Sequence, residues 1–249
     1  SGRYPVLSAG INSTINLQNE GAVQGDLKEG MEAYFKWIEE ILPDCKTNAK
    51  NIFGFKGASF PLLPDKGIGV SFYYTPNSQI GIWPYWISAG GCLLRQFWEH
   101  FLVTGDTEFL AKRLVPAYKE LALFYEDFLT VTDNDGNYIF SPSISPENTT
   151  RNTIPSGPVL INASMDIAVC REVLTILIQS CEILGTEQEN VTKWQSILAK
   201  LPPYLLEADG TLKEWAWPTL EEHYNHRHIS HLYGVWPGNE IDPDRTPGL

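Results

Sequence analysis

Residues 86–103 read WISAGGCLLRQFWEHFLV, and the spacing of their large apolar side chains indicates the fold class. These side chains recur three or four positions apart, at Leu93, Leu94, Phe97, Trp98 and Phe101. Because successive residues of an α-helix are about 100° apart, this period places them on one helix face. Gly105 follows and predicts the end of the helix.

The helical period continues on both sides of this segment. Upstream, residues 27–42 carry one apolar stripe, made of Met31, Phe35, Ile38 and Leu42. Pro43 predicts the end of that helix, because proline lacks the backbone N–H that a helix interior uses. Downstream, Asp106 is placed to cap a helix that runs to about Leu129, with a kink at Pro116.

Two further helices are predicted in the C-terminal half. Residues 164–184 are periodic and are closed by Gly185. Thr186 and Glu189 have the spacing of a capping box, which predicts a further helix that ends before Pro202.

Two Asp-Gly turns separate the helical segments, DNDGNY at 133–138 and EADGTL at 207–212. Each predicts a short hairpin that leads into a polar, aromatic or proline-rich loop. At least five helices in hairpin-like succession, with their loops at one end, are the layout of an α/α toroid. We find no fixed repeat period that would favour a solenoid. The sequence therefore predicts an all-α fold, an (α/α)6 toroid.

Composition limits the classes of partner. The chain has 249 residues, of which 43% are hydrophobic, enough for a sizeable core. With 18 Lys and Arg against 30 Asp and Glu, its net charge of −12 repels phosphate backbones, so we expect no nucleic-acid partner. No window approaches the about 18 apolar residues of a membrane span. Neutral ligands are favoured.

The cysteines form no C-x-x-C pair, which disfavours zinc ribbons and thioredoxin-like redox sites. Cys170 and Cys181 fall on one predicted helix, about 16 Å apart, too far for a disulfide. We expect all four cysteines to be buried thiols, namely Cys45, Cys92, Cys170 and Cys181.

Four of the five histidines lie in EEHYNHRHISHLYG, residues 221–234. His226, His228 and His231 are two and three positions apart, and no H-E-x-x-H occurs, so a metal site is disfavoured. The imidazoles and the guanidinium of Arg227 suit hydrogen bonding to several sugar hydroxyls. Histidines satisfied within a polar core are the competing interpretation.

Glu147 lies in FSPSISPENTT, residues 140–150, between two Ser-Pro steps and a run of small polar residues. Pro142 and Pro146 make this segment stiff and non-helical. A stiff segment is either a linker between helices or a support that holds a carboxyl group against a substrate. The other carboxylate candidates are Glu99, Glu214, Glu221 and Glu222, whereas Asp106 is assigned to a cap and Asp166 to a first helical turn.

Four segments together resemble a known family. SPSISPEN, WEHFLVTGDTEFL, LPPYLLEADGTLKEW and HRHISHLYGVWPGNEI occur at separate places in the chain. They are similar to the catalytic domain of the glycoside hydrolase family 95 α-L-fucosidases and α-L-galactosidases, over roughly residues 80 to 245. The resemblance implies an (α/α)6 barrel, inversion at the anomeric carbon, and a bacterial secreted or periplasmic setting. We also expect catalysis without a cofactor or metal, because sugar hydrolysis by paired acid and base groups needs neither.

The resemblance assigns roles to individual residues. Glu147 matches the general acid, and Arg227 and His228 match sugar-binding residues. TINLQ at 14–18 is similar to the family's N-I-N-L-Q, in which two asparagines help position the attacking water. Asn16 keeps the second of these asparagines, and Thr14 stands at the first.

Exposed tryptophan faces suit the apolar faces of sugar rings. Trp83 and Trp86 are therefore further substrate-binding candidates, and the competing interpretation places such residues in the core.

Other family features are absent from the sequence. It contains no I-D-G-N-F-G-like motif with the family's base-assisting Asp, and no segment matching the flanking β-domains. We therefore interpret residues 1–249 as part of an (α/α)6 glycoside hydrolase catalytic domain, incomplete as a toroid. A reduced, inactive relative is the other interpretation.

The functional expectation is an inverting glycoside hydrolase that removes terminal α-L-fucosyl or related α-L-galactosyl residues from an oligosaccharide or glycan. Two alternatives stay open. One is a carbohydrate-binding α/α domain with reduced catalysis, as Thr14 and the absent Asp would suggest. The other is an α/α-toroid enzyme acting on a different glycan.

Overall fold

The computed structural model describes residues 19, 21–62, 85–152 and 159–249. Within these ranges the regular elements are helices, and β pairing is limited to isolated bridges. The all-α prediction is confirmed. Among the helices described, none combines the length and apolar character needed to cross a membrane.

Helix α2 spans Lys28–Asn48 and continues into a π-helical segment, Ala49–Phe53. The predicted end at Pro43 is wrong, because Pro43 lies inside the helix. The buried residues Cys45 and Asn48 follow it, so packing of the last turns compensates for the one backbone hydrogen bond that proline removes. The chain leaves this helix at Gly54, whose φ of 76° is left-handed.

Helix α3 spans Ala89–Thr104 and ends at Gly105, with φ 65°, as predicted. Asp106 caps the next helix, because its carboxylate accepts a hydrogen bond of 2.9 Å from the N–H of Phe109. That helix has three parts: α4 (Thr107–Phe109), a π-helical segment (Leu110–Leu114) and α5 (Val115–Phe128). The interruption ends two residues before Pro116, where the sequence predicts a kink.

Helix α6 spans Ser164–Leu184 and ends at Gly185, with φ 65°, and α7 spans Gln188–Leu198. Both helices are confirmed, but the capping box is wrong. The N–H of Thr186 donates to the carbonyl of Cys181, so Thr186 completes α6. The residue at the start of α7 is instead Glu187, with φ 61° and no side-chain cap.

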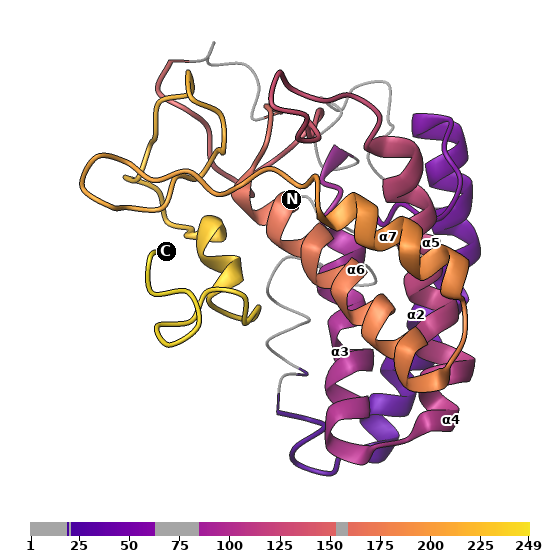
Figure 1. Ribbon diagram of the computed structural model, residues 1–249. Coiled ribbons are helices and arrows are strands. Elements are labelled where there is room, and N and C mark those ends of the chain that lie inside the picture. The colour runs from indigo at the N-terminus through magenta and orange to yellow at the C-terminus, as the bar shows by residue number, and fades with distance from the viewer. Residues whose placement is uncertain (1–18, 20, 63–84, 153–158) are drawn as a thin grey trace, which may run out of the picture.

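Helix α6 is the centre of the assembly and contacts α3, α5 and α7 (Figure 1). The approach of α3 is close, since a Cβ at Gly91 would lie 2.3 Å from Val169 Cγ1 and 2.9 Å from Val173 Cγ2. The four cysteines are free and buried, as predicted.

Segments 129–152 and 199–249, which contain no α-helix, lie beside these helices (Figure 1). Both Asp-Gly turns are confirmed: Thr132 pairs with Tyr138 and Leu206 with Leu212 across them. A short 3-10 helix, Ser230–Gly234, returns to α6. The N–H of Ser164, at the start of α6, donates to the carbonyl of Glu214 at 2.9 Å. Segment 199–249 is therefore attached to the N-terminal end of α6.

Candidate active site

Residues 143–148, which we call the Glu147 loop, are held by the protein core. Ser143, Ile144 and Ser145 are each 0% exposed, and Asn148 is 1% exposed. The side chain of Glu147 is 29% exposed. The loop therefore presents one partly exposed carboxylate from an otherwise buried segment, which a simple surface linker would not do.

Glu147 contacts two of the residues that the sequence singles out. The guanidinium of Arg227 forms an ion pair with its Oε2, and His228 Nε2 lies 3.1 Å from the same oxygen. A further hydrogen bond joins the two segments, since the hydroxyl of Ser230 donates to the carbonyl of Pro146. The structure thus brings Glu147, Arg227 and His228 together, although about 80 residues of chain separate them.

Two buried carboxylates, Asp166 and Glu214, accept hydrogen bonds from the Glu147 loop. Asp166, in the first turn of α6, accepts hydrogen bonds from the hydroxyls of Ser88 and Ser143 and from the N–H of Ile144. Burial raises the pKa of Asp166 to about 6, against the lowering effect of these donors. Assigning Asp166 only to a first helical turn overlooks this contact.

Glu214 is the second of these carboxylates and is 1% exposed. It accepts a hydrogen bond of 2.6 Å from the hydroxyl of Ser145, and another from the side-chain amide of Asn148. Burial, together with the nearby charge of Glu222, raises the pKa of Glu214 to about 7. The hydrogen bonds from the loop act in the opposite direction.

Glu222 supports the extended segment that carries Glu214. Its carboxylate accepts the N–H of Glu214 at 2.7 Å and lies 3.4 Å from the ammonium of Lys213. Burial raises the pKa of Glu222, while these partners lower it. Glu222 is thus a structural support, and its neighbour Glu221 is exposed.

The remaining predicted site residues divide into two groups. Thr14, Asn16 and Trp83 lie outside the described residues. Trp86 is described and is 1% exposed, so its ring packs in the core and offers no face to a sugar. Its burial favours the competing structural interpretation of this tryptophan.

The other histidines of the cluster have separate environments. His226 Nδ1 accepts the N–H of His228 at 3.1 Å. His231 is 8% exposed, and burial lowers its pKa. In the described ranges, no group of three or more His, Cys, Asp or Glu side chains is arranged to hold a metal ion.

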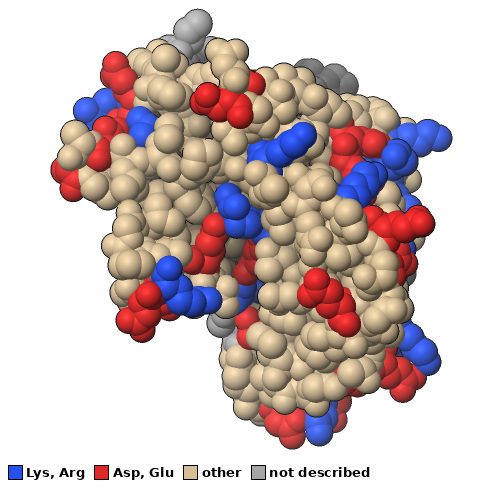
Figure 2. Space-filling model, in the orientation of Figure 1, with Lys and Arg blue, Asp and Glu red and all other residues tan. Residues whose placement is uncertain are grey.

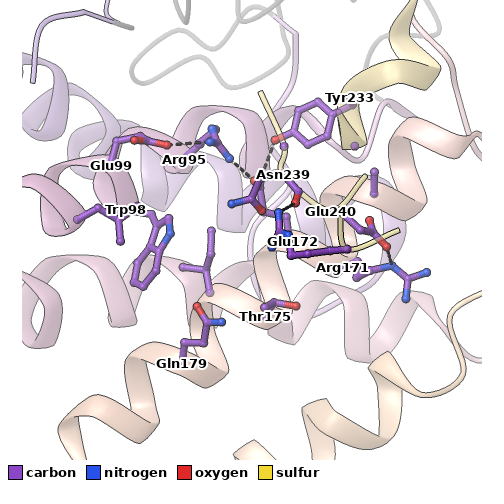
Figure 3. A pocket seen from close by; sticks show the side chains of 16 residues that line it. Arg95, Trp98, Glu99, Arg171, Glu172, Thr175, Gln179, Tyr233, Asn239 and Glu240 are labelled. Carbon is purple, nitrogen blue, oxygen red and sulfur yellow. Dashed lines mark hydrogen bonds and ion pairs between the residues drawn. The ribbon is translucent and has the colours of Figure 1, made fainter. Parts of the chain in front are cut away.

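A separate cavity of about 410 Å³ lies between α3, α6 and residues 233–245. Figure 2 shows the surface hollowed between the helices and the C-terminal segment, with acidic and basic side chains at the hollow. Arg95 pairs there with Glu99 at 2.7 Å and with Glu172, which also accepts the Tyr233 hydroxyl at 2.6 Å (Figure 3). Burial raises the pKa of Glu172. The lining does not include Glu147, so this cavity is distinct from the Glu147 constellation.

Comparison with known families decides the assignment. The glycosyl hydrolase family 95 catalytic domain matches residues 8–249. The chain belongs to this family. The family 95 chain is also 30% identical over 243 residues to Alpha-L-fucosidase 2 of Arabidopsis thaliana, covering 96% of the chain and 28% of that protein.

A second curated relative is more distant. Probable alpha-fucosidase A of Aspergillus niger is 23% identical over 249 residues, covering 94% of the chain and 29% of that protein. The family 95 chain therefore spans less than a third of the length of either relative.

The fold has a counterpart among solved structures. A putative kojibiose phosphorylase from the human microbiome superposes with a TM-score of 0.50 at 10% identity, covering 70% of this chain and 24% of that one. At such low identity the likeness concerns the fold alone. It supports the prediction of an α/α toroid, of which the described helices are a part.

Proposed function

We propose that the protein to which this chain belongs is an inverting glycoside hydrolase that releases terminal α-L-fucosyl residues from glycans. Family membership and the names of two relatives support the reaction class and the sugar. The observation that carries the assignment of a general acid is Glu147, partly exposed and in contact with Arg227 and His228.

The proposed chemistry uses two groups on opposite sides of the sugar. In an inverting enzyme, a carboxylic acid protonates the glycosidic oxygen while a water attacks the anomeric carbon from the other face. Glu147 would be the acid. Arg227 and His228 lie beside it with N–H groups that suit sugar hydroxyls. We assign positioning of the water to Asn16, with Thr14 and Trp83 as substrate contacts, from sequence alone.

The finer features of the proposal have their own checks. An α-L-galactosyl group is the second sugar to be tested, because the resembled family includes enzymes of both kinds. Secretion or export to the periplasm is also proposed, and fractionation of the source cells tests it.

The decisive experiment uses the full-length protein with aryl α-L-fucosides, aryl α-L-galactosides and fucosylated oligosaccharides. Proton NMR of the first-formed sugar should show the β-anomer, as inversion requires. In Glu147→Gln, hydrolysis of unactivated oligosaccharides should fall by about 10²- to 10⁴-fold, because the amide cannot donate the proton. Aryl substrates with good leaving groups should lose less.

Other outcomes would redirect the assignment. Sugar binding without turnover by the wild-type protein would favour a carbohydrate-binding domain with reduced catalysis. Turnover of a different glycan would favour another toroid hydrolase. Near-normal hydrolysis of an unactivated oligosaccharide by Glu147→Gln would remove Glu147 from the mechanism.

A further inference from the structure

Glu214 is a buried carboxylate that is hydrogen-bonded to the loop carrying the proposed general acid. Its two side-chain donors, Ser145 and Asn148, stand on either side of Glu147 in the chain. A single carboxylate therefore holds the residue two positions before Glu147 and the residue directly after it.

The backbone of Glu214 is itself fixed from two directions. Its carbonyl accepts the N–H of Ser164, the first residue of α6. Its own N–H donates to Glu222 at 2.7 Å, and the adjacent Trp215 pairs with Ala163. The carboxylate of Glu214 is thus attached to a rigid part of the fold, as a support for a site residue must be.

The same carboxylate lies where the two site segments meet. Asn148 Nδ2 donates to the carbonyl of His223 at 3.0 Å as well as to Glu214. His231 Nδ1 lies 4.0 Å from Glu214 Oε2, three residues beyond His228. Glu214 therefore borders both the Glu147 loop and the segment that provides Arg227 and His228.

We propose that Glu214 is a positioning residue for the general acid: it holds Ser145 and Asn148 and so fixes the direction in which Glu147 projects. This inference rests on the proposed function of Glu147. Glu214 is buried, and its role is to act through the loop and not on the substrate.

The charge state of Glu214 adds a readout that packing alone would not give. With a pKa of about 7, the group changes charge near neutral pH. The ionisable groups that face it are Glu222, Tyr224 and His231, with Lys213 beyond Glu222. Hydrogen bonds from Ser145 and Asn148 to the ionised carboxylate are stronger than to the neutral acid. The loop should be held more firmly above about pH 7.

The test compares kcat and KM of the full-length protein with those of Glu214→Ala, Glu214→Gln and Ser145→Ala on an unactivated fucosylated oligosaccharide. Misplacing a catalytic group by about 1 Å costs on the order of 100-fold, so we expect Glu214→Ala to lower kcat by about 10- to 100-fold with little change in KM. Glu214→Gln should restore most of this loss, because its oxygen can accept from Asn148 while its amide donates to the Ser145 hydroxyl.

Ser145→Ala removes one of the two contacts from the loop side and keeps the proposal falsifiable if Glu214→Ala does not fold. It should lower kcat in the same sense. A matched control is Glu126→Gln, a carboxylate with 6% of its side chain exposed that accepts the Trp194 indole N–H at 2.9 Å between α5 and α7. This control should leave kcat unchanged.

The pH dependence of kcat provides the final comparison. The kcat of the wild type should rise as the pH increases through about 7, because Glu214 becomes ionised. The kcat of Glu214→Gln should lack this rise. An active wild type that loses activity in Glu147→Gln, but keeps its full kcat in Ser145→Ala and its profile in Glu214→Gln, would overturn the positioning role alone. An inactive wild type, or an active Glu147→Gln, would instead reject the proposed function.

Discussion

His228 Nε2 lies 3.1 Å from Glu147 Oε2, although the two residues are 81 positions apart in the chain. The contact is one of several between the same two segments, since Ser230 also donates to the carbonyl of Pro146. The histidine-rich segment and the Glu147 loop therefore form one structural unit. A substitution in either segment should therefore change the position of the Glu147 carboxylate.

Replacing Arg227 tests this unit directly. Its guanidinium pairs with Glu147, and its side chain is 67% exposed, so Arg227 contributes little to the core. Arg227→Ala also removes the hydrogen bond that we propose between the guanidinium and a sugar hydroxyl. Because a hydrogen bond to a charged group is worth about 1.5–3 kcal/mol, this variant should lower kcat/KM by about 10- to 100-fold. The kcat/KM of Arg227→Lys should lie between those of the wild type and Arg227→Ala, because lysine keeps the charge but lacks the planar guanidinium.

Steady-state kinetics on the preferred substrate provide the measurement for both Arg227 variants. Arg245→Ala is a suitable control, because Arg245 is 62% exposed and pairs with Asp242 at 3.6 Å. Equal losses in the two alanine variants would argue against a specific role for Arg227.

The contact between α3 and α6 gives a prediction about stability. Gly91→Ala would place a Cβ 2.3 Å from Val169 Cγ1, and overpacking of this kind costs about 1–3 kcal/mol. Gly30 lies in α2, and a Cβ added there would meet no atom within 4 Å, so Gly30→Ala should stabilise by about 0.5–1 kcal/mol. Urea denaturation measures both, and a stabilising Gly91→Ala would contradict the close packing.

The helices could be predicted because their signals are local. The apolar stripe of α3 and the left-handed glycines Gly105 and Gly185 depend on neighbouring residues only. The two failures involve contacts from elsewhere. Helix α2 continues beyond Pro43 because Cys45 and Asn48, which follow Pro43, are buried. Helix α7 begins after Glu187 and not after Thr186, and Glu187 forms an ion pair of 2.7 Å with Lys119 of α5.

The candidate site could be predicted only in part, for the same reason. Glu147, Arg227 and His228 can be selected because the motifs around them resemble those of family 95, whereas local sequence alone leaves a structural role open for each. Glu214 appeared only as one carboxylate among several, because its partners Ser145 and Asn148 lie 69 and 66 residues away. The small polar residues that flank Glu147 were the available signal, since buried hydroxyl and amide groups require partners.

Metal removal should leave the activity unchanged. The proposed reaction needs one carboxylic acid and a positioned water, with no metal in either role. In addition, His226 Nδ1 already accepts a hydrogen bond from the N–H of His228. Dialysis of the full-length protein against a chelator, followed by assay, provides the measurement. Activity that is lost and then restored by a divalent cation would return the histidine cluster to consideration as ligands.

Asp166 gives a prediction about the pH dependence of stability. Burial raises its pKa from 3.8 to about 6 in the folded protein, so the folded state holds this proton more tightly than the unfolded state.

The resulting stability is present below about pH 4 and is lost as the pH rises through about 6. Asp166→Asn keeps the shape and cannot ionise, so the wild type should become less stable relative to this variant between about pH 4 and 6.5. The difference should then level off. Thermal unfolding of both proteins across this range measures it, and the other buried acids cancel in the comparison.

Asp209→Asn provides a control of opposite sign, because the N–H of Thr211 lowers the pKa of Asp209. A difference between wild type and Asp166→Asn that is constant with pH would show that Asp166 does not change its ionisation on folding.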